Sequence, residues 1–344
     1  MKREAGIIDY TKKLAHFVDK GIPVPEIIAN TYRDIENPGL RTAFYNILKS
    51  MRAGNSFSDA LKSTPGVYED YLVKIIGAGE ENNDLSSTLY DVAGYLQKRE
   101  SLISSFHEFL CSKVISLDII GGFYAIIFIL FTPTLAKIVE SYDITLPKIT
   151  CFLISITHLF ENKYFLIFYI LFFVVINSLV FSRKITVAGL FFQFPLWRNY
   201  RFKANMLAVV DLLEIMLKRG FTLIECMKEI SRIPELKPIK KKFAWKLESS
   251  GEDTSLPDVL YKSGLFPDIY MDTFEAIDSG EKLLSFLKFR SIEYRRELTL
   301  DLKKSNKTDL LFIMLFFGCN VFYIIMSFYM LFFGSCMLHH PFLR

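Results

Sequence analysis

A stretch that the chain carries twice decides the fold. Residues 10–31 read YTKKLAHFVDKGIPVPEIIANT, and residues 209–230 read VVDLLEIMLKRGFTLIECMKEI. At one constant offset of 199 residues, four pairs of identical residues meet: Gly21 and Gly220, Glu26 and Glu225, Asp59 and Asp258, Leu61 and Leu260. With small gaps, Arg99-Glu100 also meets Arg296-Glu297. The chain therefore carries one module in two copies.

Both copies have the apolar spacing of helices. In the first copy, Leu14, Phe17 and Val18 recur at the i, i+3, i+4 positions of a helix face. A glycine followed by Ile22-Pro23 then predicts the end of that helix. The second copy repeats the pattern with Leu213, Met216 and Leu217 before its own glycine. Capping residues at 56–59 and 254–258 predict further helix starts. No stretch alternates as a strand does, so each copy is predicted to form an all-α helical bundle.

Three uncharged apolar runs are long enough to cross a membrane, which takes about 20 helical residues. They cover residues 119–136, 164–181 and 310–333. With their flanks they predict three transmembrane helices, at 114–138, 164–182 and 310–333. The polar start of the chain, Met1-Lys2-Arg3-Glu4, predicts no cleavable signal peptide.

Lysine and arginine set the expected orientation of these spans. The segments that border the spans at 98–113, 182–203 and 288–307 are basic, whereas the loop 139–163 carries only Lys148 and Lys163. Two cytoplasmic bundles are therefore predicted, at 1–113 and 183–309. The loop 139–163 and the tail 334–344 are predicted to lie on the side of the membrane away from the cytoplasm.

Composition and motifs argue against several classes of function. The net charge of +4 is too small to indicate a nucleic-acid partner. The five cysteines form no CxxC pair, and the five histidines form no HExxH motif, so no metal site is expected. There is no GxxxxGK[ST] run for a nucleotide and no GxSxG nucleophile motif. We expect no catalytic residue and no cofactor.

The dipeptide Gly79-Glu80 has a counterpart in Gly280-Glu281 when a two-residue gap is allowed. One interpretation is a helix C-cap glycine followed by an acidic residue that opens the next helix, where the helix dipole favours it. The other is that Glu80 and Glu281 contact a partner from equivalent surfaces. The two interpretations are compatible.

Polar and small residues mark the predicted spans. Asp118 lies at the inner edge of the first span, either as an interfacial acid that reaches water or as a contact to a partner protein. Asn177 and Asn320 lie inside the second and third spans, where amides usually hydrogen-bond to a neighbouring helix. Gly121-Gly122 allows two helices to approach closely.

Several segments, taken in order with the duplication, resemble a known family. They are the two Gly-Glu dipeptides, Thr132-Pro133-Thr134-Leu135, Leu146-Pro147-Lys148-Ile149-Thr150, and Phe194-Pro195-Leu196 before a basic stretch. Over roughly residues 10–335 the chain resembles the inner-membrane platform proteins of type II secretion systems and type IV pilus machines, the F/PilC family. Asn83 stands where this family usually has a glycine, and asparagine also adopts a left-handed conformation. In its compact modules and short length, the chain is more similar to the type IVb pilus branch of this family than to the general secretion branch.

The resemblance implies a non-enzymatic scaffold in the bacterial inner membrane, with a cytoplasmic N-terminus and a periplasmic C-terminus. Its implied partners are a hexameric assembly ATPase, pilin or pseudopilin subunits, other inner-membrane assembly proteins, membrane lipid and a second copy of the chain in a dimer. No nucleic acid is implied. The candidate partner contacts are Glu80, Glu281 and Asp118. The candidate structural positions are Gly79, Gly280, Pro133, Leu146, Pro147 and Thr150.

Two other classes of function stay open at this point. A transporter subunit driven by a separate ATPase needs polar groups along a path through the bilayer, and the spans offer only Asn177, Asn320 and the marginal Asp118. A membrane-bound enzyme such as a lipid-active transferase ranks last, because the chain has no constellation of His, Asp or Cys residues to support it.

Overall fold

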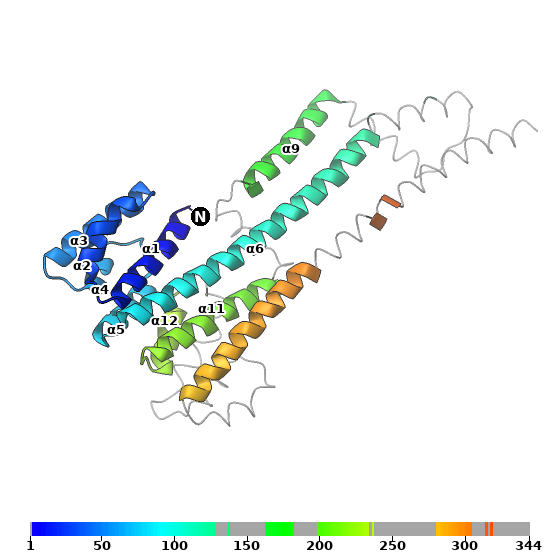
Figure 1. Cartoon of the computed structure of the whole chain (residues 1–344). Helices are drawn as coiled ribbons and strands as arrows, with labels where there is room; N and C mark the ends of the chain where they lie inside the picture. The colour runs from blue at the N-terminus through cyan, green and yellow to red at the C-terminus, as the bar shows by residue number, and fades with distance from the viewer. Residues whose placement is uncertain are drawn as a thin grey trace, which may run out of the picture. The chain divides into compact units, whose positions relative to one another are not determined.

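The computed structural model describes residues 2–127, 129, 137, 162–181, 198–233, 236, 280–304, 314–315 and 317–318 (Figure 1). Every regular element in these ranges is a helix, as the apolar spacing predicted. The chain divides into two compact units. The first unit comprises Met1–Ser104 and Phe194–Thr299, and the second comprises Ser105–Gln193 and Leu300–Arg344. The described helices of both copies of the module thus belong to the first unit, apart from residues 105–126 and 300–304, which belong to the second.

The first copy folds as a run of mostly short helices that ends in a long one. They are α1 (Lys2–Asp19), α2 (Val24–Thr31), the 3-10 turn η1 (Tyr32–Asp34), α3 (Pro38–Arg52), α4 (Phe57–Lys62), α5 (Asp70–Glu81) and α6 (Leu85–Ile126). Their apolar faces meet in a core of fully buried side chains that includes Leu14, Ile28, Leu40, Phe44, Phe57, Leu72, Ile75 and Leu89. Burial of these faces stabilises helices that are too short to be stable alone.

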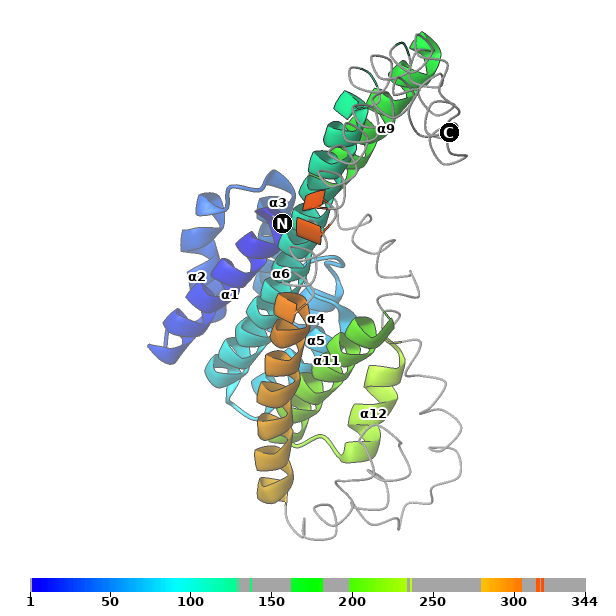
Figure 2. The ribbon, with the colours of Figure 1, turned by 90° about the vertical axis from the view of Figure 1, so that its right-hand side faces the viewer.

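The second copy contributes α11 (Arg198–Lys218), α12 (Leu223–Ser231) and a helical segment at 280–304. Figures 1 and 2 show the segment 280–304, in yellow to orange, alongside α11. The side chains of Leu207, Leu213 and Leu287 are fully buried in this part of the first unit. The boundaries predicted for two separate bundles stay predictions.

The duplicated stretch ends its first helix in the same way in both copies. Gly21 and Gly220 follow α1 and α11 with φ of 79° and 87°, in the left-handed region that glycine adopts without strain. The same backbone hydrogen bond closes each last turn, from Ile22 N to Phe17 O at 3.1 Å and from Phe221 N to Met216 O at 3.2 Å. Both ends are Schellman motifs, and the predicted glycine stops are confirmed.

Side chains cap the starts of α4 and α12. Ser56 accepts a hydrogen bond from the backbone N–H of Asp59 at 3.1 Å and so begins α4, as the capping pattern predicted. Thr222 and Glu225 form a capping box at the start of α12, with each side chain bonded to the other residue's backbone N–H. The predicted cap at 254–258 lies outside the described residues.

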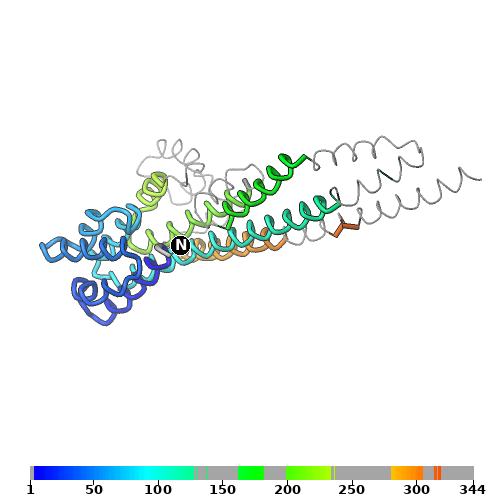
Figure 3. The backbone as a smooth tube through the Cα atoms, turned by 90° about the horizontal axis from the view of Figure 1, so that it is seen from above, coloured from blue at the N-terminus to red at the C-terminus, as the bar shows by residue number. Residues whose placement is uncertain are grey.

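The second unit contains apolar helices long enough to cross a membrane. Two helices of the described part qualify by length and composition, α6 and α9 (Lys163–Phe181), with mean hydropathies of 1.6 and 2.5 in their most apolar windows. Figure 3 shows α9 beside the second part of α6. Of the predicted third span, only residues 314–315 and 317–318 are described, and all four are helical. Phe317 packs edge-on against Phe123 of α6, with ring centroids 4.6 Å apart.

Candidate functional site

Glu80 connects two helices of the first copy. It lies in the last turn of α5, and its two carboxylate oxygens accept hydrogen bonds from Phe57 N at 2.8 Å and Ser58 N at 2.9 Å. These N–H groups open α4 and have no partner within that helix. A carboxylate at a helix N-terminus is also favoured by the helix dipole. Glu80 therefore caps α4 from outside.

Gly79 lies inside α5 and is buried, so the interpretation of Gly79 as a helix C-cap is wrong. A Cβ atom at this position would lie 2.6 Å from the Cβ atom of Thr88, which is itself fully buried on α6. The glycine lets α5 and α6 approach closely. The left-handed residue after α5 is instead Asn83, with φ of 54°, which confirms the conformation expected there. Glu80 likewise does not open the next helix, because α6 begins only at Leu85.

The second Gly-Glu dipeptide has different surroundings. Gly280 and Glu281 are both exposed at the start of the segment 280–304. A Cβ atom added at Gly280 would meet nothing within 4 Å. The described neighbours of Glu80 and Glu281 therefore differ, and contact with a partner at either position stays a prediction.

A buried arginine joins the second copy to the first. The side chain of Arg219, only 2% exposed at the end of α11, forms ion pairs with Asp84 and Asp91 at the start of α6. Its Nη2 also donates to Ser87 Oγ at 2.9 Å. Lys218 adds an ion pair to Asp91 at 2.9 Å. Charge-assisted hydrogen bonds of this kind are among the stronger polar contacts in proteins.

The first copy also contacts the first turn of α6, through the C-terminal end of α1. Ser86 Oγ donates to the carbonyl of Ala15 and to the carboxylate of Asp19, both at 3.2 Å, near the end of α1. The first turns of α6 therefore contact the C-terminal ends of α1 and α11, which are the equivalent helices of the two copies. Sequence reasoning missed this joint, because an arginine before a cap glycine is ordinary.

A buried acid forms a second joint. Asp211 of α11 is 5% exposed and accepts hydrogen bonds from Ser291 Oγ and from Arg295 Nη2, the latter at 3.3 Å. Lys98 Nζ of α6 lies 4.0 Å from the same carboxylate. A buried carboxylate is stable when its oxygens are bonded and its charge is balanced. Asp211 therefore ties α11 to α6 and to the segment 280–304, and no sequence signal pointed to it.

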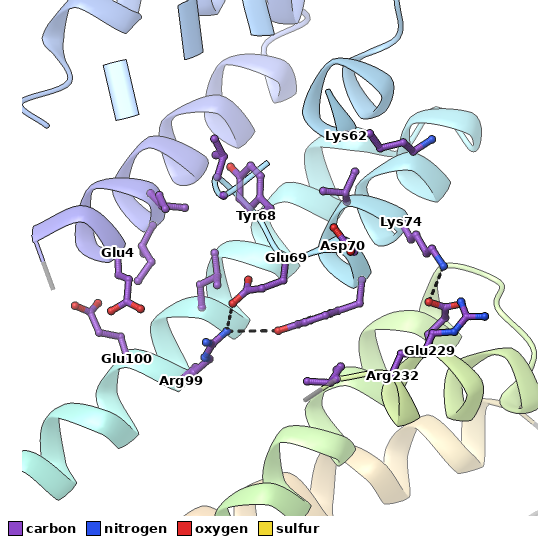
Figure 4. A pocket seen from close by; sticks show the side chains of 18 of the residues that line it. Glu4, Lys62, Tyr68, Glu69, Asp70, Lys74, Arg99, Glu100, Glu229 and Arg232 are labelled. Atoms are coloured by element: carbon purple, nitrogen blue, oxygen red, sulfur yellow. Dashed lines mark hydrogen bonds and ion pairs between the residues drawn. The ribbon is translucent and has the colours of Figure 1, made fainter. Parts of the chain in front are cut away.

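A groove of about 830 Å³ opens between helices of both copies in the first unit (Figure 4). Its lining combines apolar side chains, among them Ile7, Ile8, Leu96 and Ile103, with charged side chains. On one side Arg99 bonds Glu69 at 2.6 Å. On the other side Glu229 pairs with Lys74 at 2.6 Å and with Arg232 at 2.7 Å. The mixture suits the binding of a protein segment.

Three titratable groups in the groove lining, Tyr68, Tyr71 and Arg99, have strongly perturbed pKa values. Burial raises the pKa of the Tyr71 phenol, and the nearby Tyr95 and Glu69 add to the effect. Arg99 Nη1 donates to Tyr71 OH at 3.4 Å. A neutral phenol of this kind can donate a hydrogen bond but cannot act as a base at neutral pH. Among the residues that the structure describes, no group of three or more His, Cys, Asp or Glu could hold a metal ion.

The second unit brings together the polar and small residues expected in the spans. Asn177 Nδ2 of α9 donates to Asp118 Oδ1 of α6 at 3.1 Å, so the predicted bond to a neighbouring helix is confirmed. A Cβ atom at Gly121 would lie 2.6 Å from the Phe173 ring, which confirms a close helix approach there. Gly122 has no neighbour within 4 Å of such an atom. His107 Nε2 lies 2.9 Å from the carbonyl of Val180 at the end of α9.

Several predicted positions fall outside the described residues. They are Pro133, Leu146, Pro147, Thr150 and Asn320.

One region of the chain matches a known protein family. Residues 10–133 match the family described as type II secretion system (T2SS), protein F. This confirms, over that region, the resemblance seen in the sequence. The matched region covers α2 to α6 and the second half of α1.

Curated relatives carry two kinds of name. The chain is 25% identical over 159 residues to the type IV pilus assembly protein PilC of Myxococcus xanthus, a match that covers 46% of the chain and 38% of the relative. It is 24% identical over 152 residues to the type II secretion system protein F of Vibrio cholerae, covering 44% and 37%. The type IV pilus assembly protein TapC of Aeromonas hydrophila is 25% identical over 161 residues, covering 46% and 38%. The chain thus spans about two fifths of the length of the curated relatives it matches.

Proposed function

Because residues 10–133 form a type II secretion protein F domain, we propose that the chain is an inner-membrane platform protein of a type IV pilus or type II secretion machine. It couples a cytoplasmic assembly ATPase to the extraction of pilin or pseudopilin from the bilayer and to filament assembly. The observation that carries the proposal is the matched domain itself, in which a bundle of short helices continues into α6 and its apolar second part.

In this proposal α6 and α9 cross the inner membrane together with a third helix in the run 310–333. The first unit lies in the cytoplasm, and the tail 334–344 lies in the periplasm. The exposed apolar side chains of α9 support a lipid-facing helix, among them Ile167, Phe168, Leu171, Phe172 and Val174. The basic segments at 98–113 and 288–307 support the orientation.

The cytoplasmic unit receives the ATPase, and α6 transmits the resulting force. α6 has 42 residues, which corresponds to a length of about 63 Å. Its first turns are held by Ser86 bonds to the end of α1 and by the ion pairs of Arg219 from α11. A force applied to either copy of the module therefore acts on the same end of α6. The groove beside it supports an ATPase contact, because it offers both apolar and charged side chains.

The chain itself performs no bond chemistry in this proposal. The energy comes from the separate ATPase, and the platform supplies position and mechanical coupling. Other inner-membrane assembly proteins, membrane lipid and a second copy of the chain complete the partner set. The duplicated module suits a symmetric partner such as a hexameric ATPase.

Deletion of the gene in its host tests the proposal. We expect loss of surface filaments, or of the secreted substrate, with unchanged amounts of pilin and ATPase in the cell. Complementation with the wild-type chain restores assembly. Normal filament and secretion levels in the deletion strain would overturn the proposal. Loss of uptake or export of a solute, with normal filaments, would point to a transporter subunit instead.

A further inference from the structure

Asp118 and Asn177 leave two hydrogen-bond acceptors without a donor at the edge of the helix pair. The amide nitrogen of Asn177 donates to Asp118 Oδ1 at 3.1 Å and to the carbonyl of Phe173, one turn earlier in α9, at 2.9 Å. An amide nitrogen has only two protons to give, so both are used. Within the described part of the chain, Asp118 Oδ2 and Asn177 Oδ1 have no hydrogen-bond partner.

These two acceptors belong to a negatively charged site. An ionised carboxylate can only accept, so Asn177 must turn its nitrogen toward Asp118 and leave its carbonyl oxygen available. Both side chains are half-buried and can be reached from outside the helix pair. The site thus presents one negative charge and two acceptor oxygens.

The surroundings make this charge costly unless it is paired. On α6, Asp118 lies next to the exposed apolar side chains of Leu117 and Ile119 and directly before the uncharged run. In the orientation proposed above, the carboxylate lies at the cytoplasmic edge of the hydrocarbon. An ionisable group at that depth reaches water or finds a partner of opposite charge.

We propose that Asp118 and Asn177 form a receptor site for a cationic hydrogen-bond donor at the cytoplasmic end of a partner's transmembrane helix. The ligand is an ammonium or guanidinium group, which supplies both the missing donors and the opposite charge. Such a group fits better than a calcium or magnesium ion, for which this site supplies only two of the six or more oxygen ligands that the ion takes. This inference rests on the proposed function only in that α6 and α9 span the membrane.

A designed probe helix tests the site without knowledge of the natural partner. The probe is a single-span leucine-alanine helix with one arginine near one end, and its reference carries glutamine at that place. Binding of each labelled probe to the full chain is measured by energy transfer in phosphatidylcholine vesicles. We expect the wild type to bind the arginine probe about tenfold more tightly than the glutamine probe.

Variants of the chain separate a charge effect from a folding effect. Asp118→Asn should abolish the tenfold preference, so that the two probes bind with about equal affinity. Asp118→Glu should keep most of the preference. Glu108→Gln makes the same charge change at an exposed position of α6 and should leave the preference intact. Unchanged helix content by circular dichroism shows that each variant is folded.

Equal binding of the two probes to the wild type would overturn the inference, as would a preserved preference in Asp118→Asn. A preference that disappears when phosphatidylethanolamine is added would assign the site to a lipid headgroup and overturn the assignment to a helix. None of these outcomes touches the platform function, which the deletion strain tests separately.

Discussion

The Oε1 atom of Glu80 lies 2.8 Å from the backbone nitrogen of Phe57, 23 residues earlier in the chain. The bond gives the charged member of the first Gly-Glu dipeptide a partner within the bundle, as a cap that one helix provides for another. Glu281 is exposed and has other surroundings. The shared dipeptide therefore has a structural role in the first copy that the described part of the second copy does not repeat.

Removing the Glu80 carboxylate should destabilise the first unit. Glu80→Ala leaves two N–H groups of α4 without their acceptor, and we expect a loss of about 1–2 kcal/mol in unfolding free energy. Denaturation of the detergent-solubilised chain, followed by circular dichroism, measures the change. Glu81→Ala, at the exposed neighbouring position, is the matched control and should cost less than about 0.5 kcal/mol. Equal effects of the two substitutions would contradict the capping role.

The two glycines of the repeated dipeptide should respond in opposite ways to alanine. Gly79→Ala brings a methyl group to 2.6 Å from the Thr88 Cβ atom and should destabilise the fold by about 1–3 kcal/mol. Gly280→Ala meets no neighbour within 4 Å and should be neutral or stabilising by up to about 1 kcal/mol, because alanine favours helix. Thermal melting of the two variants beside the wild type measures whether each substitution lowers or raises the stability. A tolerated Gly79→Ala would show that α5 and α6 do not pack as described.

What the sequence could predict depends on how far apart the interacting groups are. The helix ends at Gly21 and Gly220 were predictable because a C-cap is set by neighbouring residues. The Asn177 bond was predictable in kind, because an amide in an apolar helix has few other choices. The role of Glu80 was not, since its partners lie 22 and 23 residues upstream. The ion pairs of Arg219 join residues 135 and 128 positions apart, and no local pattern reveals them.

Loss of the Arg219 side chain should weaken the joint between the two copies. Arg219→Ala leaves Asp84 and Asp91 without their buried partner, and we expect a loss of about 2–3 kcal/mol, below the value for a fully buried pair because Asp84 is half exposed. Hydrogen exchange of the first turns of α6 should rise in this variant. Arg232→Ala removes an exposed arginine and should change stability by less than about 0.5 kcal/mol. Unchanged exchange in Arg219→Ala would contradict the joint.

The capping box of α12 should make part of the stability of the fold depend on pH, because it is lost when Glu225 is protonated. The backbone and hydroxyl hydrogen bonds from Thr222 lower the pKa of the Glu225 carboxyl. Its contribution is therefore present above the pKa of the unfolded chain, about 4.3, and is lost as the pH falls through the lower folded value. Melting temperatures between about pH 6 and pH 3 should fall less steeply in Glu225→Gln than in the wild type. Parallel curves for the two proteins would show that the box is not formed.

Photo-crosslinking in the living host tests the platform function most directly. A photoreactive residue replaces Glu100 in the groove or Phe172 on the exposed face of α9, and the captured proteins are identified by mass spectrometry. The proposed function predicts that the groove position captures an assembly ATPase and that the α9 position captures a pilin or pseudopilin. Capture of neither class, from strains that assemble filaments normally, would contradict it.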